Sequence, residues 1–361
     1  MNAHIINCKE DEFQTFVTSG YIGVGIVTLG TTPQQLSLAC KTSFSMYADM
    51  KTVRPGDMIF VHAGQKIYGA FKAESHFMED SSAPGIYLSK NIHYNPTPGR
   101  PGSGWKNVTS LPAIGPYRKV AISHWVDARG RNLCYPEGFD STEIFDLKSE
   151  KKLFSVPERW KYTDAARTVR PLFAFEAQEL LHLLQRANSD VTKRLTVAPT
   201  SLTGYSPIVL VLDPHLANDE KIVEATLVEN LGLGGPLDNL VGPVDSFGNN
   251  VPSGYLKFID ILGYAEFDQN ARKFRVIEVK KDELVFPDEV RQLVGYLDWA
   301  TVSIAKGDHR NVEGILVALG FSDECKTFVT NYNTVNTGRK IKLVRFEYDP
   351  PNYQKLNFHP A

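Results

Sequence analysis

The chain has 361 residues, about the length of two domains at roughly 100–200 residues each. Its composition, 42% hydrophobic and 22% charged, is that of an ordinary globular protein and excludes a collagenous, coiled-coil or disordered chain. The net charge of −2, from 39 Lys and Arg against 41 Asp and Glu, lacks the positive excess that often marks a polyphosphate-binding surface.

The apolar runs are far shorter than the roughly 18 residues that a membrane-spanning helix needs. The N-terminal sequence has no basic region followed by an apolar core, so we expect no secretory signal. The cysteines, Cys8, Cys40, Cys134 and Cys325, lie far apart without a CxxC pair, which argues against a disulfide framework or a zinc knuckle. We therefore expect a cytoplasmic protein with no membrane partner.

The first 150 residues or so predict short strands separated by Gly and Pro turns. The expected strands are Tyr21–Leu29, Met58–His62, Ile67–Ala73, Lys119–His124 and Glu143–Leu147. Short alternating segments with turn signals are typical of a small barrel or sandwich. An amphipathic helix is expected next, over Ala174–Arg186.

A polar, Thr- and Ser-rich stretch, Asn188–Gly204, suggests a domain boundary, so we expect domains over residues 1–190 and 191–361. Strands and helices alternate after it. The expected strands are Ile208–Leu212, Leu256–Tyr264, Phe274–Lys281 and Gly314–Gly320, and the expected helices are Asp219–Leu231 and Asp288–Ile304. That order predicts an α/β domain with a mixed sheet covered by helices.

Three charged residues interrupt the apolar strands of the second half. Side chains in a strand alternate between its faces, so Glu278 and Lys280 point the same way. Asp260 interrupts the preceding strand, and a hairpin would place it beside Glu278. Glu and Lys are seldom buried unless they are paired or functional. Two carboxylates and an ammonium at a strand end suit a Mg²⁺ site. Lys280 is then either a general base or a charge-stabilising group that orients a water or supports an oxyanion.

These residues resemble the D-Xn-(D/E)-x-K signature of the PD-(D/E)XK nuclease superfamily. The following segment, Asp288–Leu297, is similar to a helix of the NucS-type endonucleases, in which a Gln and a Tyr accompany the metal site. Gln292 and Tyr296 match that pair and share a helix face. The resemblance implies a third acidic residue on the preceding helix, with Glu224 favoured and Glu220 the alternative. It also implies Mg²⁺, with Mn²⁺ able to replace it.

Structural interpretations of the same residues stay open. Asp260 is also compatible with a turn, and Glu278 with Lys280 is compatible with a solvent-facing ion pair on an edge strand. Acidic residues such as Glu220 and Glu224 commonly form a charged helix face, favoured near a helix N-terminus by the dipole.

In the first half, Pro55-Gly56-Asp57 leads into an apolar strand, and Gly69 lies in the strand that follows. This pattern resembles that of the EVE/PUA-like family. The resemblance implies a domain that holds a flipped, modified base in an aromatic pocket. The candidate pocket walls are Tyr21, Phe44, Tyr47, Trp105 and Trp125.

The sequence thus predicts a two-domain α+β protein, with an N-terminal PUA/EVE-like β-barrel and flanking helices and a C-terminal restriction-endonuclease-like mixed sheet. The favoured function is a Mg²⁺-dependent, modification-dependent restriction endonuclease that recognises a modified cytosine in double-stranded DNA. Cutting both strands would take two active sites, so a homodimer is expected. The alternatives are a NucS-like mismatch- or structure-specific repair endonuclease, a sequence-specific type II restriction enzyme and a non-catalytic binder of modified nucleic acid.

Overall fold

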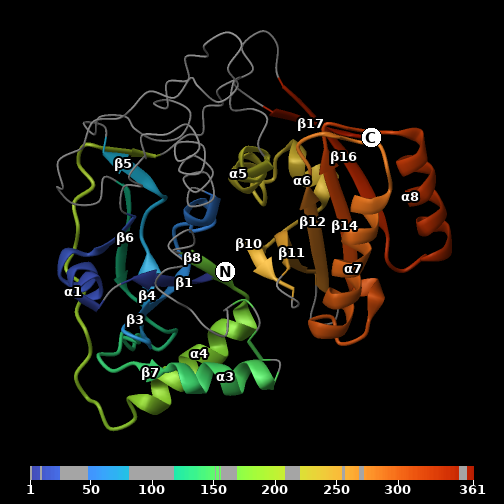
Figure 1. Cartoon of the computed structure of the whole chain (residues 1–361). Helices are drawn as coiled ribbons and strands as arrows, with labels where there is room; N and C mark the ends of the chain where they lie inside the picture. The colour runs from blue at the N-terminus through green and yellow to red at the C-terminus, as the bar shows by residue number, and fades with distance from the viewer. Residues whose placement is uncertain are drawn as a thin grey trace, which may run out of the picture. The chain divides into compact units, whose positions relative to one another are not determined.

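Two compact units make up the chain, Met1–Val209 and Leu210–Ala361 (Figure 1). The structure, a computed structural model, describes residues 2–8, 10–24, 48–80, 118–150, 152–153, 155, 169–207, 220–253, 257–267, 272–348 and 356–361. Within these residues each unit is built around a sheet of its own.

Among its described residues the first unit contains a nine-stranded sheet, three helices given below and a helical turn at residues 48–51. The strands are β1 (Ala3–Cys8), β2 (Tyr21–Val24), β3 (Met58–Ala63), β4 (Lys66–Ala73), β5 (Met78–Asp80), β6 (Arg118–His124), β7 (Phe139–Asp140), β8 (Val169–Leu172) and β9 (Tyr205–Pro207). The helices are α1 (Glu10–Ser19), α3 (Ser141–Ser149) and α4 (Ala174–Ala187).

Strand β6 joins two halves of this sheet. Its Ile122–His124 end pairs with β4, while its Arg118–Ala121 end pairs with β2. A strand that serves two sheet halves makes a corner, so the sheet is curved. The expected closed PUA/EVE-like barrel remains a prediction. The expected helix over Ala174–Arg186 is present as α4, and its Leu180 and Leu184 are fully buried in the core beside the sheet.

The predicted strand Glu143–Leu147 is wrong, because these residues belong to helix α3. Asp140 caps this helix, since its side chain accepts a hydrogen bond from the Thr142 backbone N–H. Ile144 and Leu147, three residues apart, are both buried in the core of the first unit. A helical spacing of apolar residues, rather than a strand alternation, therefore governs this segment.

Residues between the expected boundary and Val209 lie with the first unit. The Leu195 backbone N–H donates to the Cys134 carbonyl at 3.0 Å, and the Ala198 N–H donates to the Val17 carbonyl at 3.2 Å. Strand β9 then pairs with β5. The polar composition of the segment reflects an extended chain along the surface of the first unit, and the division falls after Val209.

The second unit contains a six-stranded sheet, a two-stranded sheet and four α-helices among its described residues. The strands are β10 (Ser246–Pro252), β11 (Phe258–Glu266), β12 (Arg272–Val279), β13 (Glu283–Leu284), β14 (Val312–Ala318), β15 (Gly320–Phe321), β16 (Ile341–Tyr348) and β17 (Leu356–Pro360). The helices are α5 (Glu220–Asn230), α6 (Pro236–Val241), α7 (Asp288–Ser303) and α8 (Asp323–Val335), with a 3-10 turn at His309–Asn311.

The order of the larger sheet is β10-β11-β12-β14-β16-β17. Strands β12, β14 and β16 are parallel, whereas β10, β11 and β12 form antiparallel pairs. Helix α7 connects β12 to β14, and α8 connects β14 to β16 (Figure 1). A Cβ added at Gly314 would lie 3.1 Å from the Leu297 side chain, so this glycine allows α7 close to β14. The predicted mixed sheet with helices is confirmed.

The parallel order brings three strand ends together. Because the carboxyl ends of parallel strands meet at one edge of a sheet, Val279, Ala318 and Tyr348 end their strands toward the same edge. The expected strand Ile208–Leu212 lies outside the described residues. Within the residues that are described, no helix combines the length and apolar character needed to cross a membrane.

Candidate active site in the second unit

The β11–β12 hairpin brings the two candidate carboxylates together. Ile261 pairs with Ile277 in this antiparallel pair, so one further step sets Asp260 opposite Glu278. The Asp260 carboxylate accepts a hydrogen bond from the Val279 backbone N–H, with Oδ2 at 2.9 Å from the nitrogen. Asp260 is therefore fixed at the carboxyl end of β12, as the spacing of the two residues predicted.

Glu278 is almost fully buried, with 2% of its surface exposed. Its Oε1 accepts hydrogen bonds from Lys280 Nζ at 2.6 Å and from Gln292 Nε2 at 3.0 Å. Its Oε2 is buried and has no hydrogen-bond partner among the described residues. Burial, with the nearby Asp260 charge adding to it, raises the pKa of Glu278 to about 8. A buried carboxylate oxygen without a partner needs either a proton or a cation.

Lys280 provides positive charge beside this pair. Burial alone would lower the pKa of Lys280, but the charge and hydrogen bond of Glu278 and the charge of Asp260 outweigh it and raise that pKa. The Lys280 side chain therefore stays an ammonium at neutral pH. Its backbone N–H donates to the Val317 carbonyl at 2.8 Å, which holds the residue against β14 just past the end of β12.

Helix α7 supplies the two residues predicted on one of its faces. Gln292 Nε2 lies 2.9 Å from Tyr296 Oη as well as 3.0 Å from Glu278 Oε1, so its two amide hydrogens link the tyrosine to the carboxylate. Burial raises the pKa of Tyr296 and the Gln292 hydrogen bond only partly offsets this, so the phenol stays protonated. The structure thus brings Gln292 to Glu278 directly and Tyr296 through Gln292.

Helix α5 holds Glu224 in a different set of contacts. Glu224 is fully buried, with 0% of its surface exposed. Its Oε1 accepts a hydrogen bond from Asn250 Nδ2 at 2.7 Å, and its Oε2 accepts one from Lys221 Nζ. Lys221 Nζ also lies 3.3 Å from Asn250 Oδ1 and 3.8 Å from Asp260 Oδ1. Both carboxylate oxygens of Glu224 therefore serve to hold Lys221 and Asn250 next to Asp260.

Glu220 begins the same helix and acts on the same pair of residues. Its charge helps to raise the pKa of Glu278, after burial and the larger effect of Asp260. Its charge also supports the raised pKa of Lys280, after the larger effects of Glu278 and Asp260. Glu220 is only partly buried, so its carboxylate is more accessible than that of Glu224.

The donor set fits a hard divalent cation. In the part of the chain that the structure describes, no group of three or more His, Cys, Asp and Glu side chains forms a ready-made metal cluster. Mg²⁺ is commonly bound by only one or two carboxylates, with water and substrate phosphate completing its shell. Asp260 and the unpartnered Oε2 of Glu278 supply such a pair. A cation there would remove the cost of the buried carboxylate.

Sequence reasoning missed two residues of this cluster. Lys221 follows Glu220 in the helix, and only its spacing of three from Glu224 marked it as a neighbour of an acidic residue. Asn250 falls between the pairs Asn249–Ile261 and Val251–Ile259, which sets it opposite Asp260. Its φ of +52° lies in the left-handed region, which Asn tolerates better than most residues.

The aromatic candidates of the first unit fall into separate groups. Phe44, Tyr47 and Trp105 lie outside the described residues. Tyr21, on β2, is partly buried, and the Lys119 ammonium lies 4.6 Å from the centre of its ring. The same ammonium lies 4.2 Å from the ring centre of Tyr205, so two aromatic rings face one cation.

The surroundings of Trp125 differ from those of Tyr21. It packs against the hydrophobic core of the first unit. Its backbone N–H donates to the Ala70 carbonyl at 3.0 Å, and its own carbonyl accepts from the Leu133 N–H at 2.8 Å. These contacts account for Trp125 as a packing residue that links β4 to the segment after β6.

Comparisons with known proteins give little overlap. No protein-family model matches the chain, and no curated protein matches it. Among solved structures, a repair endonuclease from Pyrococcus abyssi is 21% identical over 27% of this chain, with a TM-score of 0.20. The similarity spans 36% of that protein's chain, about a third of its length. So weak an overlap adds nothing to the geometry above.

Proposed function

We propose that the chain is a Mg²⁺-dependent DNA endonuclease that hydrolyses phosphodiester bonds with its second unit. The observation that carries this proposal is the buried Glu278 carboxylate. One of its oxygens is held by Lys280 and Gln292, and the other has no partner among the described residues. Asp260 lies across the hairpin from it. Buried carboxylate oxygens without a partner are uncommon in folded proteins, and a bound cation would satisfy this one.

Each residue of the cluster has a distinct chemical role. Asp260 and Glu278 would hold the ion. Bound Mg²⁺, or Mn²⁺ in its place, lowers the pKa of a coordinated water and neutralises charge on the phosphodiester. Lys280 keeps its proton because of the neighbouring carboxylates, so it donates hydrogen bonds to a phosphate oxygen or to the attacking water rather than acting as a base. Gln292 orients Glu278, and Tyr296 orients Gln292.

The third acidic residue is assigned on the hydrogen bonds of helix α5. Glu224 has both oxygens engaged, so its contacts favour a positioning role that holds Lys221 beside Asp260. Glu220 is the more accessible carboxylate and acts electrostatically on both Glu278 and Lys280. We therefore place Glu220, rather than Glu224, next to the substrate-facing side of the site.

The proposal also states what the first unit recognises, which is a modified cytosine in double-stranded DNA. Tyr21 and Tyr205 face the Lys119 ammonium in the first unit, and aromatic faces with a nearby cation suit a base and its backbone. Stacking on such rings would offset the few kcal/mol, roughly, that extruding a base costs. Cleavage of both strands would then use two copies of the chain as a homodimer in the cytoplasm.

The test is cleavage of matched duplexes in Mg²⁺. The duplexes carry cytosine, 5-methylcytosine or 5-hydroxymethylcytosine at the same positions, and a fourth contains a mismatch. Cutting confined to the modified duplexes supports the whole proposal. Cutting of the mismatch alone keeps the nuclease and replaces the reader with mismatch recognition. Absence of cutting in every duplex, with Mg²⁺ or Mn²⁺, contradicts the enzymatic proposal.

Substitutions at the site separate chemistry from folding. Lys280→Ala is expected to lower the cleavage rate by about a thousandfold, since it removes a donor aimed at developing charge. DNA binding should be retained. Lys281→Ala is the matched control, because this neighbouring lysine is 40% exposed and lies 3.7 Å from Asp282. If Lys280→Ala cut as fast as Lys281→Ala, the assignment of the active site would be wrong.

A further inference from the structure

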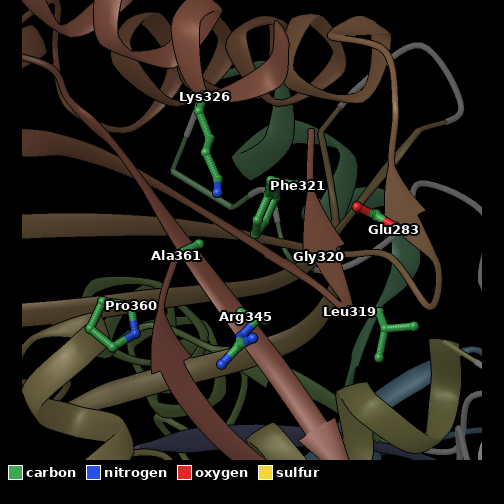
Figure 2. A pocket seen from close by; sticks show the side chains of 8 residues that line it. All are labelled: Glu283, Leu319, Gly320, Phe321, Lys326, Arg345, Pro360 and Ala361. Carbon is green, nitrogen blue, oxygen red and sulfur yellow. The ribbon is translucent and has the colours of Figure 1, made fainter. Parts of the chain in front are cut away.

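A pocket of about 390 Å³ opens in the second unit, away from the carboxylate cluster (Figure 2). Lys326 of α8 and Arg345 of β16 line it together with Phe321 of β15. Figure 2 shows the Lys326 side chain reaching from the helix toward Phe321, while Arg345 lies between Pro360 and Leu319. The volume is within the range of roughly 300–1,000 Å³ that small-ligand sites occupy.

The sheet register ties this pocket to the proposed active site. Ala318 pairs with Arg345, and Val279 pairs with Val317, so one further step sets Lys280 beside Ala318. Lys280, Ala318 and Arg345 therefore form one row across β12, β14 and β16, at the carboxyl edge and on one face of the sheet. With neighbouring strands about 4.8 Å apart, Arg345 begins roughly 10 Å from Lys280.

Two cationic side chains line the pocket. They are Lys326 and Arg345, and Glu283 is the acidic side chain among the lining residues, which also include Ala361. Lys326 forms no ion pair with any other residue that the structure describes. Arg345 Nη2 lies 3.6 Å from Glu347 Oε2, and both side chains are half exposed, so this pair is weak. Both cations are thus available to an anionic ligand.

The rest of the wall is apolar. Leu319 is 42% exposed, and Phe321 is buried. Pro360 of β17 closes the other side. A phosphate at the two cations with a sugar or base against the apolar wall matches this combination, whereas free inorganic phosphate would leave the apolar part unused. A cationic end beside an apolar wall is a combination that suits a nucleotide.

We propose that this pocket binds one nucleotide of the DNA strand that is being cut, with its phosphate held by Lys326 and Arg345. The proposal rests on the nuclease function above and names the path of its substrate along the sheet edge. Each nucleotide of one strand adds at least the roughly 3.4 Å axial rise of duplex DNA, so a span of roughly 10 Å covers at most about three nucleotides. The pocket would therefore hold the strand within about three nucleotides of the scissile phosphate.

The test compares two double variants of the full chain. Lys326→Ala with Arg345→Ala removes the pocket cations. Lys273→Ala with Arg310→Ala makes the same change of charge at the amino end of β12, where Lys273 Nζ donates to the Arg310 carbonyl. Binding of a 30-base-pair duplex is measured against salt concentration, with Ca²⁺ replacing Mg²⁺ so that no cutting occurs. Thermal unfolding checks that both variants fold.

The pocket variant is expected to bind about tenfold more weakly and to lower the slope of log K against log salt by about 1, the value for one lost phosphate contact. The control variant should keep the slope of the wild type. A duplex series with a neutral methylphosphonate at one position then locates the contact. Wild-type binding should weaken most with the neutral linkage at one position within about three nucleotides of the cut, and the pocket variant should lose this sensitivity.

The outcomes distinguish the pocket from the nuclease. If the wild type cuts DNA and the pocket variant keeps the wild-type slope, the pocket inference is overturned and the nuclease stands. If both double variants lower the slope of log K against log salt by the same amount, the effect is general electrostatics and the inference is again overturned. The wild type could also cut no DNA while the pocket variant, and not the control, lowers the slope of log K against log salt. In that case the nuclease proposal fails and the pocket remains a nucleotide-binding site.

Discussion

Lys221 Nζ lies 3.8 Å from Asp260 Oδ1 while it donates a hydrogen bond to the buried Glu224. The ammonium therefore links the first turn of α5 to strand β11. It also partly balances the negative charge that Asp260 and Glu278 accumulate at the end of the hairpin. Glu224 is buried and accepts the hydrogen bond from Lys221, so the packing of α5 sets the position of this cation.

Glu224 and Glu220 are expected to differ when each is changed to Gln. Glu224→Gln should lower the free energy of unfolding by about 2 kcal/mol, because it leaves the Lys221 cation without its buried partner. Glu220→Gln should change that free energy by less than about 0.5 kcal/mol, as surface substitutions do, but raise the Mg²⁺ concentration needed for cleavage. Urea unfolding and Mg²⁺ titrations measure the two effects. The reverse pattern would make Glu224 the third ligand.

Glu278 should make the metal-free protein less stable as the pH rises. Its pKa is raised to about 8 in the fold from an ordinary value of 4.5, so folding favours the protonated carboxyl. The stabilising contribution is complete below pH 4.5 and is lost as the pH rises toward 8. We expect a loss on the order of 3–4 kcal/mol between pH 5 and pH 8 in EDTA. Glu278→Gln should flatten this dependence, and a profile equally steep in that variant would contradict the assignment.

Mg²⁺ should stabilise the wild type, and more at pH 8 than at pH 5. An ion that binds only the folded state raises the free energy of unfolding by about 2.7 kcal/mol at a concentration 100 times its Kd. At pH 5 the proton on Glu278 competes with the ion, so the shift in Tm should be smaller. Differential scanning calorimetry in EDTA and in Mg²⁺ measures it. Asp260→Asn serves as the comparison and should show little shift at either pH.

His62 should set the acid limit of the first unit. Burial lowers the pKa of His62 from 6.5 to about 4, and its Nδ1 lies 2.9 Å from Asn7 Oδ1. The stability that this neutral ring contributes is complete above pH 6.5 and is lost as the pH falls toward 4, by up to about 3 kcal/mol. His62→Gln should reduce this loss. His182→Gln, at an exposed position of helix α4, is the comparison variant.

Local sequence patterns determined much of the second unit. The period of two in a strand set Glu278 and Lys280 on one face, and the period of a helix set Gln292 and Tyr296 on another. The interval between Asp260 and Glu278 was short enough for a hairpin, which the structure contains. These relationships depend on residues close in the chain, so the backbone geometry of single elements is sufficient to predict them.

Two local patterns compete in helix α3. Phe145 and Leu147 alternate as in a strand, but Phe145 is exposed in the structure, whereas Ile144 and Leu147 are spaced as in a helix and are both buried. The decisive local signal was the capping residue Asp140, whose side chain binds the Thr142 N–H. The packing of both apolar residues into the core of the first unit then fixes the helix.

The sequence by itself determined which residues stand at the end of the β11–β12 hairpin and on the face of α7. Only the tertiary structure decided that Lys221 and Asn250 join them, that Glu224 serves to hold those two, and that Arg345 shares a row with Lys280. The physical reason is the range of the contacts. A strand or helix period places neighbours in the chain, whereas the pairing of separate strands and the packing of helices against them place residues that lie far apart in sequence.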